Sequence, residues 1–125
     1  MKKIAPLAVL VITPAAWACF QINESSVTLH NTDIKARFAY AGKPMADDPV
    51  SLSSRKRGTF SKGSTDKEGW YVFKDVPEGE YKVTLHSPSY ESFDVLLTRN
   101  GNVKTWVAVD FVGDYCMSIR VLPER

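Results

Sequence analysis

The chain is a succession of short runs in which apolar and polar residues alternate, and glycine, proline, asparagine or aspartate separates one run from the next. In residues 34–41, for example, one side of the chain has Ile34, Ala36, Phe38 and Tyr40, and the other side has Lys35 and Arg37. This period of two is typical of a strand with one buried face. Outside the N-terminus no stretch of helical length carries apolar residues at helical spacing, so we expect an all-β protein.

Further strands are expected wherever the alternation returns between turn residues. Asn100-Gly101 predicts a hairpin between the runs on either side of it. The segment 55–63 is polar and contains glycine, and we expect a loop or a hairpin tip there. About seven strands, with turn signals roughly ten residues apart, predict an antiparallel β-sandwich. The other expected strands are 49–53, 70–73, 81–85, 93–97, 103–111 and 117–121.

Residues 1–18 have the composition of a secretory signal peptide. Two lysines precede an apolar stretch that is too short to span a bilayer, and Ala16 and Ala18 are the small residues that signal peptidase needs for a cut after Ala18. We therefore expect an exported protein, periplasmic or secreted, with a single folded domain over residues 19–125.

The predicted leader accounts for the net charge of the chain. It holds Lys2 and Lys3, two of the 16 basic residues, and none of the 14 acidic residues, so the rest of the chain has equal numbers of both. A neutral domain gives no electrostatic reason to bind nucleic acid, which needs clustered lysine and arginine. No other apolar run is long enough to be a transmembrane segment.

The only cysteines are Cys19, which would be the first residue after cleavage, and Cys116 near the C-terminus. In an exported protein such a pair predicts a disulfide, which here joins the two ends of the domain. Closing a loop of nearly a hundred residues contributes roughly 4–5 kcal/mol in the chain-entropy model. Two alternatives stay open: a lipid anchor on Cys19, although Trp17 fits a lipobox poorly, or two free thiols.

Residues 65–81 contain two turn motifs on either side of an aromatic-rich strand. The first is Thr65-Asp66-Lys67-Glu68-Gly69, and the second is Val76-Pro77-Glu78-Gly79-Glu80-Tyr81. With Gly42-Lys43-Pro44 and Pro49-Val50-Ser51-Leu52 before them and Pro88-Ser89-Tyr90 after them, the chain resembles the carboxypeptidase regulatory-like family over about residues 33–111.

This resemblance implies a transthyretin-like (prealbumin-like) sandwich, with Tyr81 turned inward at the head of its strand. Such domains act as spacers and packing partners in larger proteins, so the resemblance favours a binding or structural module. It does not specify a ligand, because one sandwich supports many functions.

The sequence contains no nucleophile elbow, phosphate loop or metal-binding His-Glu-x-x-His motif, and we expect no catalytic residue and no cofactor. Hydrolases of the transthyretin-like type pair two histidines with an arginine. That alternative needs His30 and His86 side by side near Arg37. The chain also ends in Val121-Leu122-Pro123-Glu124-Arg125 rather than in the Tyr-Arg-Gly-Ser tail of those enzymes.

We expect no metal site either. Carboxylates gather in two turns and would bind calcium if the turns met, but their spacing matches no EF-hand loop, and turn chemistry already explains Asp66. The carboxylates are Asp66, Glu68, Asp75, Glu78 and Glu80.

A basic run around Phe60 is the first candidate for a contact with a partner. An apolar aromatic in an exposed loop often marks an interface. A solvated hairpin tip, or packing of Phe60 onto the core, is the alternative. The residues of this candidate interface are Arg55, Lys56, Arg57, Phe60 and Lys62.

The aromatic residues Trp70, Tyr71 and Trp106 are the second candidate, because sugars stack on flat aromatic faces. Strand alternation puts Trp70 and Tyr71 on opposite faces, so the core covers at most one of them. Core packing is the alternative for all three. From the sequence we therefore expect an exported, non-catalytic binding or structural module that contacts another protein or a glycan.

Overall fold

The computed structural model describes residues 20–21, 26–54, 56, 58–86, 91–99, 104–112 and 116–124. Within these ranges the chain forms eleven strands, and none of the described residues is helical. Consequently no helix in this part of the chain is long and apolar enough to cross a membrane. The predicted leader and Cys19 lie outside the described residues.

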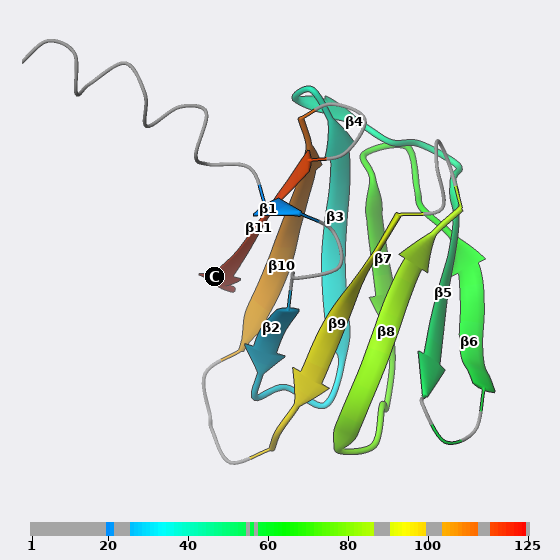
Figure 1. The fold of residues 1–125 in the computed structure, drawn as a ribbon, viewed down its shortest axis with the longest axis vertical. Helices are drawn as coiled ribbons and strands as arrows, with labels where there is room; N and C mark the ends of the chain where they lie inside the picture. Colours follow the sequence, from blue (N-terminus) through cyan, green and yellow to red (C-terminus); the bar gives the residue numbers. More distant parts are fainter. Residues whose placement is uncertain are drawn as a thin grey trace, which may run out of the picture.

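Two sheets form a sandwich, and Figure 1 shows them as two separate layers. Sheet A has the order β1 (Phe20–Gln21), β11 (Cys116–Pro123), β10 (Thr105–Phe111), β3 (Ile34–Tyr40) and β4 (Lys43–Pro44), and β7 (Trp70–Phe73) also pairs with β3. Sheet B has the order β2 (Ser26–Leu29), β9 (Glu91–Leu97), β8 (Gly79–Leu85), β5 (Pro49–Ser54) and β6 (Gly58–Ser64).

The predicted β-sandwich is confirmed, but its sheets are mixed rather than wholly antiparallel. β10 runs parallel to β3, and β2 runs parallel to β9, while the other strand pairs are antiparallel. Both parallel pairs join strands that are distant in the sequence. Parallel neighbours need long crossover connections, which local turn signals do not reveal.

The hairpin predicted at Asn100-Gly101 is wrong. β9 lies in sheet B and β10 lies in sheet A, so the chain passes from one layer to the other between them. Residues 100–103 themselves are outside the described ranges. Each of the two strands has one face buried against the opposite sheet. Alternation alone does not say whether two consecutive strands are neighbours in one sheet or lie in opposite sheets.

The loop predicted over 55–63 is also wrong in its second half, where β6 forms the outer strand of sheet B. β6 pairs with β5 through six register pairs, yet none of its side chains is buried. An edge strand of this kind needs no apolar alternation, and polar side chains on an edge oppose pairing with other chains. The sequence pattern also did not predict β1, β2 and β4, because strands of two to four residues are too short to show an alternation.

The core lies between the sheets, on the inward faces of the long strands. Buried residues alternate with less buried ones along β3, β8, β9 and β10, as the sequence predicts. The prediction for Tyr40 at the end of β3 is wrong in this respect: its side chain was expected on the inward side and is 36% exposed. Val121 of β11 is 39% exposed, although its register partner Val107 is buried. It lies at the open edge of sheet A, since β1 covers only the start of β11. The largest fully buried side chains are Phe38, Phe73, Phe111, Leu29, Ile34, Leu52, Leu85, Leu97 and Met117.

The first turn motif of the resemblance region is held by its own aspartate. The carboxylate of Asp66 accepts hydrogen bonds from the backbone N–H groups of Glu68 (2.8 Å) and Trp70 (3.0 Å). The Asp66 N–H donates to the carbonyl of Trp70 (2.9 Å), and the N–H of Gly69 donates to the carbonyl of Asp66 (3.1 Å). The turn therefore delivers the chain directly into β7, as its residues predict.

Thr65 anchors the same turn to the preceding loop. Its buried hydroxyl donates to the carbonyl of Met45 (2.6 Å) and accepts from the N–H of Asp48 (2.9 Å). Position 65 therefore needs a side chain that can donate one hydrogen bond and accept another, as a hydroxyl group can, because it serves both the carbonyl of Met45 and the N–H of Asp48.

Replacing Asp66 with asparagine is expected to weaken the acid sensitivity of the fold. The backbone N–H groups of Trp70 and Glu68 lower the pKa of Asp66 from its usual 3.8. A carboxylate with a lowered folded-state pKa stabilises the fold above its unfolded pKa, and this contribution is lost as the pH falls through the folded value. Urea unfolding midpoints of both proteins, measured from about pH 6 down to about pH 2.5, should show that the wild type loses more stability than the variant below about pH 4. Parallel curves would contradict this account.

Candidate functional site

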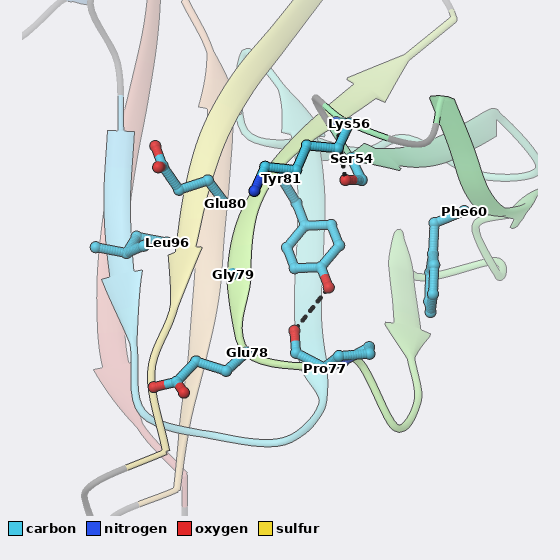
Figure 2. Close-up of a pocket in the computed structure, with 9 residues that line it drawn as sticks. All are labelled: Ser54, Lys56, Phe60, Pro77, Glu78, Gly79, Glu80, Tyr81 and Leu96. Atoms are coloured by element: carbon cyan, nitrogen blue, oxygen red, sulfur yellow. Dashed lines mark hydrogen bonds between the residues drawn. The ribbon is translucent and has the colours of Figure 1, made fainter.

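A hollow opens at the end of sheet B, where β5 stops short of its neighbour β8. The last residue of β5, Ser54, pairs with Tyr81, so β5 does not reach Gly79 and Glu80 at the start of β8. The hollow has a volume of about 420 Å³. Figure 2 shows the residues that line it, which are Ser54, Lys56, Phe60, Pro77, Glu78, Gly79, Glu80, Tyr81 and Leu96.

A second hollow of about 300 Å³ adjoins the first on the outer side of sheet B. The two share Glu80, Tyr81 and Leu96, and the second extends across β9 to Ser26 and Thr28 of β2. We call the two together the β8 groove. It crosses the strands from β2 to β6, and four strand spacings correspond to roughly 19 Å.

Two exposed apolar side chains, Phe60 and Leu96, line the first hollow, and Figure 2 shows Leu96 on the other side of the β8 ribbon from the Tyr81 ring. They are 40% and 41% exposed, whereas Tyr81 is only 7% exposed. The Phe60 ring meets the Tyr81 ring edge-on, with 5.9 Å between the ring centroids. The Tyr81 hydroxyl donates to the carbonyl of Pro77 (2.7 Å), which holds the ring against the turn before β8.

A β-bulge places Phe60 in this position. Leu52 pairs with Ser61 and Ser53 pairs with Thr59, so Phe60 is the extra residue of β6 with no partner in β5. Bulges change the direction of a side chain and are frequent next to functional sites. The sequence indicated Phe60 as unusual, and the structure shows why it faces Tyr81.

The β8 groove carries charges of both signs. Three carboxylates line it: Glu78 from the turn before β8, Glu80 from β8 and Asp94 from β9. Lys56 lines it from the connection between β5 and β6. Of the predicted basic interface, Lys56 and Phe60 are therefore in the groove. Lys62 is exposed on β6 opposite Ser51. Arg55 and Arg57 lie outside the described residues.

Sequence reasoning missed Leu96, although a signal was present. Phe93, Val95 and Leu97 form the inward face of β9, so an apolar residue at position 96 breaks the alternation and lies on the outer face. Glu80, its register partner on β8, was noted only as a turn carboxylate.

Two of the three aromatic residues of the predicted platform lie together. Trp70 of β7 and Trp106 of β10 come together on the outer face of sheet A, with 4.8 Å between their ring centroids. Tyr71 points the other way: it packs against the core and meets Phe73 edge-on at 4.7 Å. The expectation that Trp70 and Tyr71 lie on opposite faces is thus confirmed, and Tyr71 is removed from the platform.

The two histidines lie at opposite ends of sheet B. His30 Nδ1 is 2.7 Å from the Thr98 hydroxyl just after β9, and His86 Nε2 is 3.0 Å from the Ser51 hydroxyl just after β8. β8 and β9 are antiparallel and seven residues long, so these ends are roughly 20 Å apart. The paired histidines that the hydrolase alternative requires are not formed.

Among the described residues, no group of three or more histidine, cysteine, aspartate or glutamate side chains is placed to hold a metal ion. In the turn before β7 the Asp66 carboxylate already serves two backbone N–H groups. In the turn before β8, Glu78 and Glu80 line the groove instead.

Comparison with known proteins shows the fold. No family model and no curated protein sequence matches the chain. The structure is similar to transthyretin from Sparus aurata, with a TM-score of 0.57 and 15% sequence identity over 76% of this chain and 100% of that chain. At this level of identity the likeness shows a transthyretin-like fold alone. Membership of the carboxypeptidase regulatory-like family stays a prediction.

Proposed function

We propose that the protein is an exported, non-catalytic module that binds a segment of another protein in the β8 groove. The observation that carries the proposal is a hollow lined by two exposed apolar side chains, Phe60 and Leu96, together with the nearly buried Tyr81. Binding energy at interfaces concentrates on apolar and aromatic anchors in such hollows.

The dimensions of the groove favour an extended segment. A path of roughly 19 Å from β2 to β6 accommodates about six residues of extended chain. The carboxylates and Lys56 along the rim provide polar contacts that orient a bound chain.

A non-catalytic role is supported by the separation of His30 and His86 at opposite ends of sheet B. Export is supported by the composition of residues 1–18. If Cys19 carries a lipid instead of a disulfide, the same module is an envelope lipoprotein, and the groove would then act next to a membrane surface.

A photo-reactive benzoylphenylalanine at position 60 is expected to cross-link to one discrete partner in intact cells. Leu96→Asp should abolish that product, because it places a charge in the apolar part of the groove without disturbing the core. Val121→Asp is the matched control: Val121 is 39% exposed, close to the 41% of Leu96, but lies in sheet A. The products are measured by immunoblotting and mass spectrometry.

Two results would count against this site. The first is a product at position 60 that survives Leu96→Asp. The second is an equal product from the cross-linker at position 121, because that would indicate collision with abundant proteins rather than binding in the groove. Circular dichroism of each variant separates loss of binding from loss of fold.

A further inference from the structure

The part of the β8 groove next to β9 combines one exposed apolar side chain with two carboxylates. Leu96 of β9 is exposed, and its register partner in the sheet is Glu80 of β8. Directly paired residues point to the same face with their Cβ atoms about 5 Å apart, so Glu80 lies beside Leu96. Glu78 lines the same hollow, and Figure 2 shows Leu96 between the two glutamates on one side of the β8 ribbon. We call these three side chains the acidic corner.

The two glutamates of the acidic corner are not neutralised by a neighbour in the described part of the chain. Both side chains are exposed, and neither forms a hydrogen bond or an ion pair with another residue in the described ranges. The Arg99 guanidinium, which follows β9, donates to the carbonyl of Val76 instead (3.3 Å). Lys82 faces Asp94 in the next register pair along the same face, so these two charges balance each other in sign.

The cation that lines the groove belongs to its other half. Lys56 enters from the connection between β5 and β6, on the side of the β8 ribbon where Tyr81 and Phe60 lie in Figure 2. Lys56 forms no ion pair with a carboxylate of the described residues. The groove therefore keeps its charges apart, and a bound segment meets the two glutamates only where it crosses Leu96.

We propose that the segment bound in the β8 groove places a basic side chain, preferably arginine, in the acidic corner. This inference rests on the function proposed above and specifies the chemistry of the partner. The aliphatic part of a long basic side chain packs along Leu96, while its charged end reaches Glu80 and Glu78. The planar guanidinium of arginine has five donors and bonds two carboxylates at once. A wholly apolar side chain would cover Leu96 but would take the carboxylates out of water without a partner.

Short peptides test this chemistry with the purified protein. Mixtures of peptides of about six residues, the length that the groove accommodates, hold one fixed residue near the middle and uncharged residues elsewhere. Their ends are acetylated and amidated, and the fixed residue is arginine, lysine, glutamine or glutamate. Binding is followed by the amide NMR signals of Gly79, Glu80 and Leu96. The arginine mixture should bind about tenfold more tightly than the glutamine mixture, and the glutamate mixture should bind most weakly.

Two variants and a matched control locate the preference. Glu80→Gln and Glu78→Gln should each reduce the preference for arginine over glutamine to about threefold or less, and leave the affinity for the glutamine mixture unchanged. Glu68→Gln removes the same charge from another exposed glutamate, which lies in the turn before β7 and lines neither hollow, and it should keep the full preference. All three positions are exposed, so the variants should fold normally.

Equal affinity for the arginine and glutamine mixtures would overturn the proposal. A preference for arginine that survives both Glu80→Gln and Glu78→Gln, or that Glu68→Gln reduces equally, would also overturn it, because the attraction would then come from outside the acidic corner. Absence of binding by every mixture overturns it as well.

Failure of this proposal is distinguishable from failure of the proposed function. Equal binding of the arginine and glutamine mixtures, with shifted signals of Gly79 and Leu96, leaves the groove a peptide site with a different preference. The cross-link from position 60 and its sensitivity to Leu96→Asp decide separately whether the groove binds a partner in cells.

Discussion

Gly69→Ala is expected to lower the free energy of unfolding by about 3–5 kcal/mol. Gly69 has φ +87°, and a Cβ there would overlap the carbonyl oxygen of Phe38. That carbonyl accepts a hydrogen bond from the N–H of Met45 (3.0 Å), and the N–H of Phe38 donates to the carbonyl of Gly69 (2.8 Å). Alanine therefore adds backbone strain and also separates two backbone segments that bond each other.

Gly42→Ala separates these two contributions. Gly42 has a similar φ of +84°, but a Cβ there would have nothing within 4 Å. Only the backbone strain is present, so a loss of about 1–2 kcal/mol is expected. Urea unfolding of the two variants and the wild type measures the difference. Equal losses of stability at both positions would show that the Phe38 carbonyl does not hinder a methyl group at position 69.

Cys116→Ser is expected to cost about 2–5 kcal/mol, because it removes a cross-link that closes most of the chain into one loop. Cys116 is not a free cysteine in the structure. It begins β11 and pairs with Gln21 of β1, two residues after Cys19 in the chain. Pairing with Cys19 stays a prediction, since Cys19 lies outside the described residues.

A double-mutant comparison tests that pairing. Cys19→Ser should lose the same stability as Cys116→Ser, and the double variant should lose no more than either, because all three lack the same bond. The reductant dithiothreitol should bring the wild type to the level of the variants. Intact mass of the protein from cells distinguishes the alternative: a diacylglyceryl group on Cys19 together with a negligible effect of Cys116→Ser would establish a lipid anchor in place of the disulfide.

The turn at 65–69 shows how far local sequence reaches. Asp66 and Gly69 act on their own neighbours, through hydrogen bonds to Glu68 and Trp70 and through a positive φ. The same holds for Tyr81, whose inward direction follows from its place in an alternating strand. Interactions within a few residues of each other are encoded locally, and a single sequence suffices to predict them.

The candidate surfaces are different, because each combines segments that are distant in the sequence. The contact between Trp70 and Trp106 needs β7 and β10 on opposite edges of β3, and the β8 groove needs a bulge at Phe60 and a β5 strand that ends at Ser54. The sequence marked Phe60, Trp70 and Trp106 by their chemistry. It did not indicate that Trp70 meets Trp106 while Tyr71 joins the core.

By itself the sequence determined that this is an all-β sandwich, where most of its long strands lie and how its central turns are made. Those properties depend on a period of two and on turn chemistry, both of which act over short distances. Only the tertiary structure decided which sheet each strand joins, as the wrong hairpin between β9 and β10 shows. That choice depends on burying all inward faces at once, and so it belongs to the whole chain and to no single segment.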